Sequence, residues 1–128
     1  MDATDIDHSS IEGTWHPVRA EHEGQLAPDL ALLKTRMTFA DGRYCTRFGA
    51  EPSDEGMYEI SPEATGARLT LKSLKGVNAG RTIPAIFQRR GDRLRVCYGM
   101  NGALPTEFTA SLSSSRYLVT YKRAEVQD

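Results

Sequence analysis

The residues best suited to chemistry in this 128-residue chain are two cysteines, three histidines and a few acids. Cys45 and Cys97 each lie within an alternating segment, away from any helix start or glycine-rich elbow that would activate a thiol nucleophile. They are also too few and too far apart in the sequence for a zinc motif. We therefore expect two reduced thiols, with a disulfide between them as the alternative, and no catalytic residue.

The histidines make a poor metal site. His16 and His22 are separated by an even number of residues, a spacing that places both side chains on one face of a regular strand. That length of strand spans about 20 Å, which is too far for both to bind one ion. The sequence thus predicts exposed histidines, no metal site and no cofactor.

Three acids are candidates for acid–base chemistry, namely Glu55, Glu59 and Glu107. The alternation places Glu59 on the outer, solvated face of its strand. Glu107 lies in a Pro-Thr-Glu-Phe segment and is expected to accept hydrogen bonds from loop backbone or from an arginine such as Arg43 or Arg89. A structural role for Glu107 is therefore favoured over a catalytic one.

Composition excludes several classes of function. The chain has 39% hydrophobic and 26% charged residues, and 16 Lys+Arg against 17 Asp+Glu give a net charge of −1. Without a basic block, neither nucleic acid nor an anionic membrane is an expected partner. No apolar run approaches the ~20 residues that span a bilayer, and the acidic start differs from a signal peptide. These features predict a cytoplasmic, single-domain protein, and they leave its oligomeric state open.

The elements that must position these residues are short strands separated by turns. Asp41-Gly42 and Gly91-Asp92 are tight-turn dipeptides, and Ser61-Pro62 is expected to end a strand. Proline and an acid at the start of residues 28–34, with a lysine at the end, predict the single short helix. The predicted strands are 12–22, 36–39, 43–48, 56–60, 67–73, 81–89, 93–98 and 116–123, with 106–110 as a candidate extension of the sheet.

Eight short-linked strands without intervening helices exclude the βαβ folds. Closure into a barrel removes the two exposed edges of such a sheet. The sequence therefore predicts an all-β, eight-stranded antiparallel up-and-down barrel over residues 11–123, with one short helix between the first two strands. Residues 1–10 are expected to be a disordered tail and 124–128 a frayed one, and a two-sheet sandwich is the alternative architecture.

The alternation also predicts which side chains point inward. The residues expected to line the barrel interior and contact a ligand are Phe39, Tyr44, Phe48, Tyr58, Leu71, Phe87 and Tyr98. Leu30 and Leu33 of the short helix are expected to form a lid. Tyrosines in the inward set favour a cavity with some polar lining, since a buried hydroxyl needs a partner. The alternative is that these tyrosines lie at the barrel ends and reach solvent. A pocket of about 300 Å³ or more would indicate ligand binding, whereas a packed interior would indicate a module that acts through its surface.

A Gly-x-Trp on the first strand, Gly13 and Trp15, followed by a lid-like segment and a basic residue at the end of the last strand, resembles the lipocalin superfamily. The resemblance implies that Trp15 closes one end of the barrel and that Arg123, with Lys122 as the alternate, packs over its indole. A guanidinium stacked on an indole adds cation–π attraction. Gly13 would let a neighbouring backbone come close.

A second resemblance covers residues 10–123. The chain is similar to small bacterial lipocalin-like domains, abundant in planctomycetes, that have no assigned activity. The matching segments are Glu12-Gly13-Thr14-Trp15, the Leu-Leu-Lys-x-Arg-Met-Thr-Phe run to Phe39, Glu55-Gly56-x-Tyr58, Asn78-x-Gly80-Arg81-Thr82, Gly91-Asp92-x-Leu94-x-Val96-Cys97-Tyr98 and Pro105-Thr106-Glu107-Phe108. The implied function is binding of a small, largely apolar molecule in the barrel mouth. The alternatives are a filled barrel that binds a protein partner and, by fold analogy, a biosynthetic barrel enzyme.

Overall fold

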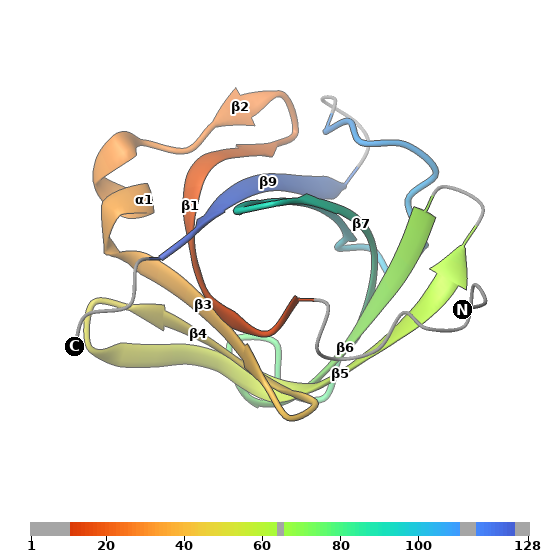
Figure 1. Ribbon diagram of the computed structural model, residues 1–128, viewed down its shortest axis with the longest axis horizontal. Helices are drawn as coiled ribbons and strands as arrows, with labels where there is room; N and C mark the ends of the chain where they lie inside the picture. Colours follow the sequence, from red (N-terminus) through yellow and green to blue (C-terminus); the bar gives the residue numbers. More distant parts are fainter. Residues whose placement is uncertain (1–10, 64–65, 111–114, 125–128) are drawn as a thin grey trace.

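The computed structural model describes residues 11–63, 66–110 and 115–124 (Figure 1). Its elements are β1 (Gly13–His22), β2 (Gln25–Leu26), α1 (Asp29–Lys34), β3 (Thr35–Ala40), β4 (Arg43–Phe48), β5 (Glu51–Glu63), β6 (Gly66–Gly76), β7 (Thr82–Arg90), β8 (Arg93–Gly99) and β9 (Arg116–Arg123). The predicted tail 1–10, with His8, and residues 125–128 of the predicted tail 124–128 lie outside the described residues. Ala124 is described, and its backbone N–H donates to the Thr14 carbonyl at 2.8 Å. Within the described ranges, no helix is long and apolar enough to cross a membrane.

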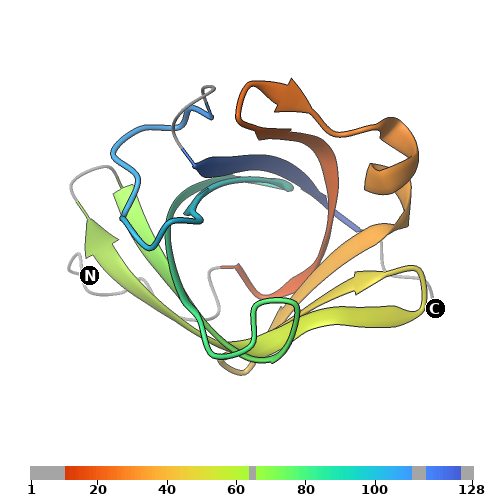
Figure 2. The same cartoon turned by 180° about the vertical axis from the view of Figure 1, so that it is seen from behind.

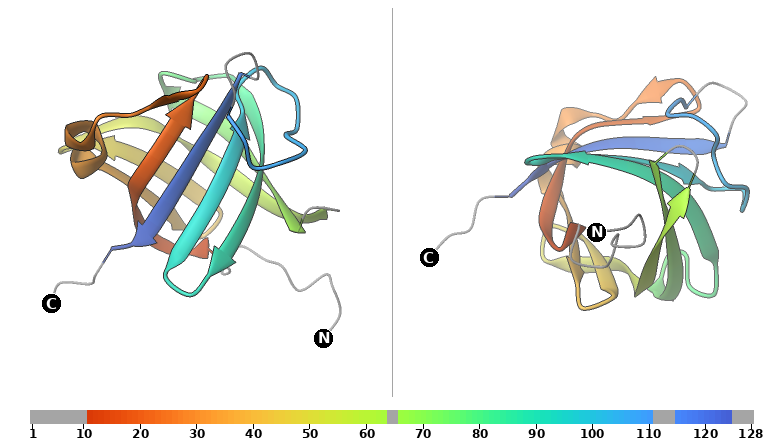
Figure 3. Two further views of the ribbon diagram at one scale, coloured as in Figure 1. Left: turned by 90° about the horizontal axis from the view of Figure 1, so that it is seen from above. Right: turned by 45° about the vertical axis from the view of Figure 1, so that its right-hand side comes forward.

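The strands form a closed antiparallel barrel. The sheet order is β2-β1-β3-β4-β5-β6-β7-β8-β9, and β1 also pairs with β9, which closes the ring. Figures 1 and 3 show this closure, with β9 lying between β1 and β8. The predicted eight-stranded up-and-down barrel is confirmed, and the two-residue β2 is an additional strand that pairs only with the end of β1.

The predicted helix is also confirmed, as α1, and it lies against the outside of the barrel wall (Figure 1). Pro28 precedes its first turn, Asp29 begins it and Lys34 ends it. Leu32 is the buried residue of α1, whereas Leu30 and Leu33 are 74% and 69% exposed. The helix therefore packs chiefly through Leu32, with Ala31 half-buried beside it.

Strand β5 is longer in both directions than the sequence predicts. The expectation that Ser61-Pro62 ends it is wrong, because the strand continues to Glu63 and Pro62 pairs with Ala67. The pairing of β4 with β5 stops at Met57, so Pro62 lies where β5 has a neighbour on one side only. A proline at such an edge leaves no ladder hydrogen bond unmade.

A β-bulge in β1 changes which faces the histidines occupy. The register of β1 with β9 shifts between Pro17 and Arg19. One extra residue in β1 reverses the alternation of its side chains beyond that point. His16 pairs with Lys122 and His22 pairs with Tyr117. Lys122 and Tyr117 are an odd number of residues apart on β9, so they and their partners face opposite sides of the sheet. The expectation that His16 and His22 share one face is therefore wrong.

One end of the barrel is filled by large side chains. Trp15 and Phe39 are fully buried, and the Phe39 ring meets the Tyr58 ring edge to face at 4.9 Å. The Trp15 indole nitrogen donates a hydrogen bond to the Ile11 carbonyl at 2.9 Å. A packed core therefore occupies this end.

Arg123 lies over Trp15, with its guanidinium carbon 4.6 Å from the ring centre. A Cβ atom on Gly13 would lie 2.2 Å from a guanidinium nitrogen of Arg123. The close neighbour of Gly13 is thus an arginine side chain rather than the backbone that the sequence suggested. Arg89 adds a second guanidinium, 5.3 Å from the same ring.

Residues 106–110 do not extend the sheet but cover the outer face of β8. The Cys97 thiol donates to the Thr109 carbonyl at 3.6 Å, and Arg95 stacks on Phe108 at 4.1 Å. Glu107 forms its ion pair with Arg116 at 3.9 Å rather than with Arg43 or Arg89. The covering segment explains why outward-pointing Cys97 is fully buried.

Candidate functional site

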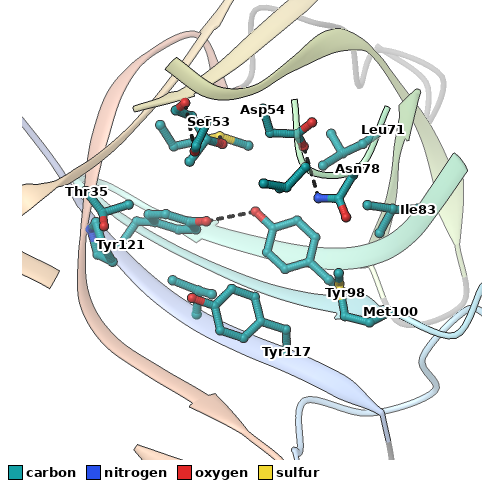
Figure 4. A pocket seen from close by; sticks show the side chains of 15 residues that line it. Thr35, Ser53, Asp54, Leu71, Asn78, Ile83, Tyr98, Met100, Tyr117 and Tyr121 are labelled. Atoms are coloured by element: carbon teal, nitrogen blue, oxygen red, sulfur yellow. Dashed lines mark hydrogen bonds between the residues drawn. The ribbon is translucent and has the colours of Figure 1, made fainter. Parts of the chain in front are cut away.

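Figure 4 shows a cavity of the barrel, which has a volume of about 170 Å³. It opens at the barrel end away from Trp15, which is not among its lining residues. The 76–81 turn, in the foreground of Figure 2, contributes Val77 and Asn78, and Met100 comes from the loop after β8. The other lining residues are Pro17, Thr35, Met37, Thr46, Ser53, Asp54, Leu71, Ile83, Tyr98, Tyr117, Val119 and Tyr121. The volume is below the ~300 Å³ that was expected above for a ligand pocket, so that criterion is not met, and the cavity suits only molecules smaller than drug-sized ligands. The interior is thus packed at one end and hollow at the other.

The structure separates six of the seven residues that were expected to contact a ligand into three groups. Leu71 and Tyr98 line the cavity. Tyr44 lies behind it and hydrogen-bonds to Asp54, which does line it. The residues buried in the packed core instead are Phe39, Tyr58 and Phe87.

Phe48 differs from the expectation, because its side chain is 48% exposed and lies under the Lys34 ammonium at the end of β4. The pairing of β4 with β3 is unbroken up to Phe48, which lies opposite Thr35 as the last residue of β4. Phe48 is therefore at the end of its strand, where the ring is left exposed. The residues that were expected to form a lid also lie elsewhere. Leu30 and Leu33 point into solvent and do not line the cavity.

Asp54 places a carboxylate in the wall of the cavity. It is 7% exposed and accepts hydrogen bonds from the Tyr44 hydroxyl at 3.1 Å, the Ser73 hydroxyl at 2.5 Å and the Asn78 amide at 3.3 Å. These donors come from β4, β6 and the 76–81 turn. Asp54 therefore joins three elements at the cavity while one side of its carboxyl group faces the open space.

A pair of tyrosines faces Asp54 across the cavity. The hydroxyls of Tyr98 and Tyr121 are 2.8 Å apart, and Tyr117 stacks on Tyr98 with ring centres 6.0 Å apart. Figure 4 shows these three rings on one side and Asp54 with Asn78 on the other. Because one hydroxyl donates to the other, the pair keeps one O–H group that can donate to a bound molecule.

Burial keeps these tyrosines protonated at high pH. It raises the pKa of Tyr44 to about 12, and the neighbouring Asp54 charge adds to the rise. Burial likewise raises the pKa values of Tyr98, Tyr117 and Tyr121. Their neutral hydroxyls are therefore hydrogen-bonding groups rather than bases at neutral pH.

Alkaline pH should destabilise the fold through these tyrosines. An unfolded tyrosine ionises near pH 10, whereas folded Tyr44 keeps its proton until about pH 12. The unfolded state then binds fewer protons, so the free energy of unfolding falls by about 1.4 kcal/mol per pH unit for each such tyrosine. Urea unfolding from pH 8 to 11.5 should show this loss, and Tyr121→Phe should reduce its slope. Equal slopes for both proteins would contradict the prediction.

The cavity residues that sequence reasoning missed are mainly Asp54, Asn78 and Tyr121. The region before residue 56 was interpreted as a loop, although Asp54, Gly56 and Tyr58 follow the period of a strand. All three point inward in β5. An acid at an inward strand position was the signal that could have identified Asp54.

The thiols and histidines do not form a reactive centre in the described parts of the chain. Cys45 and Cys97 are both free thiols, and burial raises the pKa of each, which disfavours the thiolate. No group of three or more metal-ligating side chains occurs among the described residues. Comparison of the chain with protein-family models, curated proteins and solved structures found no match.

Proposed function

We propose that this chain is a lipocalin-like binding protein that holds one small, largely apolar molecule in the mouth of its barrel. The observation that carries the proposal is the 170 Å³ cavity, which has apolar walls and a few convergent polar groups. Leu71, Ile83 and Val119 form part of the apolar wall. Asp54 and the Tyr98–Tyr121 pair supply the polar groups. Such a combination is typical of small-molecule sites.

The cavity volume limits the ligand to about one substituted ring. An apolar protein cavity of about 150 Å³ accepts benzene, so 170 Å³ has room for one ring and a short side chain. Because the cavity is open at the barrel end, a longer substituent can extend past Val77 and Met100 into solvent. The proposal therefore favours single-ring or short aliphatic molecules over retinoid-sized ones.

Mapping of binding by NMR tests this proposal. A panel of single-ring fragments should shift the backbone amide signals of Leu71, Tyr98 and Val119, while those of Trp15 and Phe39 at the packed end stay in place. Met100→Trp should fill the mouth and weaken fragment binding at least tenfold. Val18→Trp, on the 41% exposed Val18 of β1, adds the same bulk outside the cavity and should leave binding unchanged.

Fragments that shift signals only on the outer surface would contradict the proposal and favour the protein-binding alternative. A Met100→Trp variant that binds fragments as well as the original protein would also contradict it. The spread of amide signals reports whether each variant is folded, so lost binding can be separated from lost structure.

A further inference from the structure

Asp54 is unusual among the carboxylates of this protein. It is buried in the wall of the proposed binding cavity, and every group that hydrogen-bonds to it is neutral. The ion pairs of the described residues involve Glu21, Glu59 and Glu107 instead, all on other parts of the barrel. Within the described ranges, Asp54 therefore has no cationic partner.

The hydrogen-bond pattern defines Asp54 as an acceptor. Arg81 donates to the amide oxygen of Asn78 at 3.1 Å, so the amide nitrogen of Asn78 is the atom directed at Asp54. Tyr44, Ser73 and Asn78 thus all donate to the Asp54 carboxylate, which accepts each of these hydrogen bonds. Arg81 itself is exposed and bonds to Asn78 rather than to Asp54, so it does not neutralise the charge directly.

The carboxylate keeps room for one more donor. Its two oxygens offer about four acceptor positions, and Tyr44, Ser73 and Asn78 occupy three of them. An ionised carboxylate in a poorly solvated place is costly unless a cation accompanies it. The cavity thus presents a negative charge and a free acceptor position to whatever enters.

The opposite wall suits a cation as well. The rings of Tyr98, Tyr117 and Tyr121 line the cavity across from Asp54, and aromatic faces attract positive charge. A metal ion fits poorly, because the described residues hold no cluster of three metal-ligating side chains. An anion would be repelled by Asp54, and a neutral molecule would leave its charge uncompensated.

We infer that the cavity selects a small organic ammonium ion, with its N–H group on Asp54 and its apolar body against Leu71, Ile83 and Val119. This inference rests on the proposed binding function and specifies its ligand class. A primary or secondary amine supplies both the positive charge and the donor that Asp54 lacks. The cavity volume restricts its body to about one ring.

Three matched ligands test the inference by isothermal titration calorimetry. 2-Phenylethylamine, 2-phenylethanol and 3-phenylpropanoate share a ring and a two-carbon chain but carry a positive, a neutral and a negative end group. We expect the amine to bind at least tenfold more tightly than the alcohol, and the carboxylate not to bind. This order is measured on the unaltered protein, so it does not depend on how any variant folds.

Two variants then place the selectivity on Asp54. Asp54→Asn keeps the shape of the side chain and removes its charge, and it should weaken amine binding at least tenfold while leaving alcohol binding unchanged. Glu55→Gln removes the same charge from the neighbouring residue of β5, which lies outside the cavity lining, and should leave amine binding unchanged.

Equal affinity for the amine and the alcohol would overturn the ammonium inference but leave the binding function standing. Equal losses in Asp54→Asn and Glu55→Gln would overturn the assignment to Asp54. No binding of any of the three ligands would overturn the inference as well, and the fragment mapping would then decide separately whether the cavity binds molecules at all.

Discussion

Replacing Trp15 with alanine should lower the free energy of unfolding by about 3–5 kcal/mol, the usual cost of removing a large buried aromatic side chain. Trp15 is fully buried in the packed end of the barrel. Its loss would leave a cavity there and remove the ring contacts of Arg89 and Arg123. It would also leave the Ile11 carbonyl without its indole donor. Since the free energy of unfolding of small domains is about 5–15 kcal/mol in total, the variant would lose much of its stability.

Urea unfolding followed by circular dichroism measures this effect without relying on tryptophan fluorescence, because Trp15 is the only tryptophan. Phe48→Ala is the matched control, since Phe48 is an aromatic residue that is 48% exposed. It should cost under about 1 kcal/mol. A Trp15→Ala protein that loses no more than the control would contradict the view that this residue completes the core.

Replacing Gly56 with alanine should cost about 2–4 kcal/mol, because the added methyl group meets backbone on the neighbouring strand. A Cβ atom on Gly56 would lie 2.0 Å from the Lys72 carbonyl oxygen and 2.9 Å from the Ser73 Cα. The β5–β6 register also shifts beside Gly56, between it and Glu55. Relief of the clash therefore requires the two strands to separate.

Urea unfolding again gives the magnitude, with Glu59→Ala as the control on the same strand. Glu59 is exposed and pairs weakly with Lys72 at 3.7 Å, so its replacement should change stability by less than about 0.5 kcal/mol. If Gly56→Ala changed the free energy of unfolding no more than that control, the strands beside Gly56 would accommodate the added methyl group and the steric argument would be wrong.

The fold was largely predictable from local pattern. Residues that alternate with a period of two define strand faces, and Asp41-Gly42 and Gly91-Asp92 join neighbouring strands in short turns, as the structure confirms. These signals depend on residues close together in sequence. They can therefore be recognised without knowledge of the tertiary structure. Barrel closure then follows because a closed sheet has no exposed edge strands.

Prolines and β-bulges limited how well the sequence pattern could predict strand ends and the faces on which side chains lie. Pro62 was interpreted as a strand end, but its strand has only one neighbour there, so its missing N–H group costs nothing. The bulge between Pro17 and Arg19 reversed the alternation in β1 and separated His16 from His22. Both effects depend on which strand lies alongside, which a single sequence does not specify.

The sequence by itself determined the all-β barrel, the short helix and most of the inward-pointing apolar residues, because each depends on local periodicity and turn chemistry. Only the tertiary structure decided where the barrel is hollow. The cavity wall combines Asp54 of β5, Asn78 of the 76–81 turn and Tyr121 of β9, residues that are distant in sequence. Their meeting depends on strand register and closure, and it is this meeting that gives the mouth of the barrel a buried negative charge.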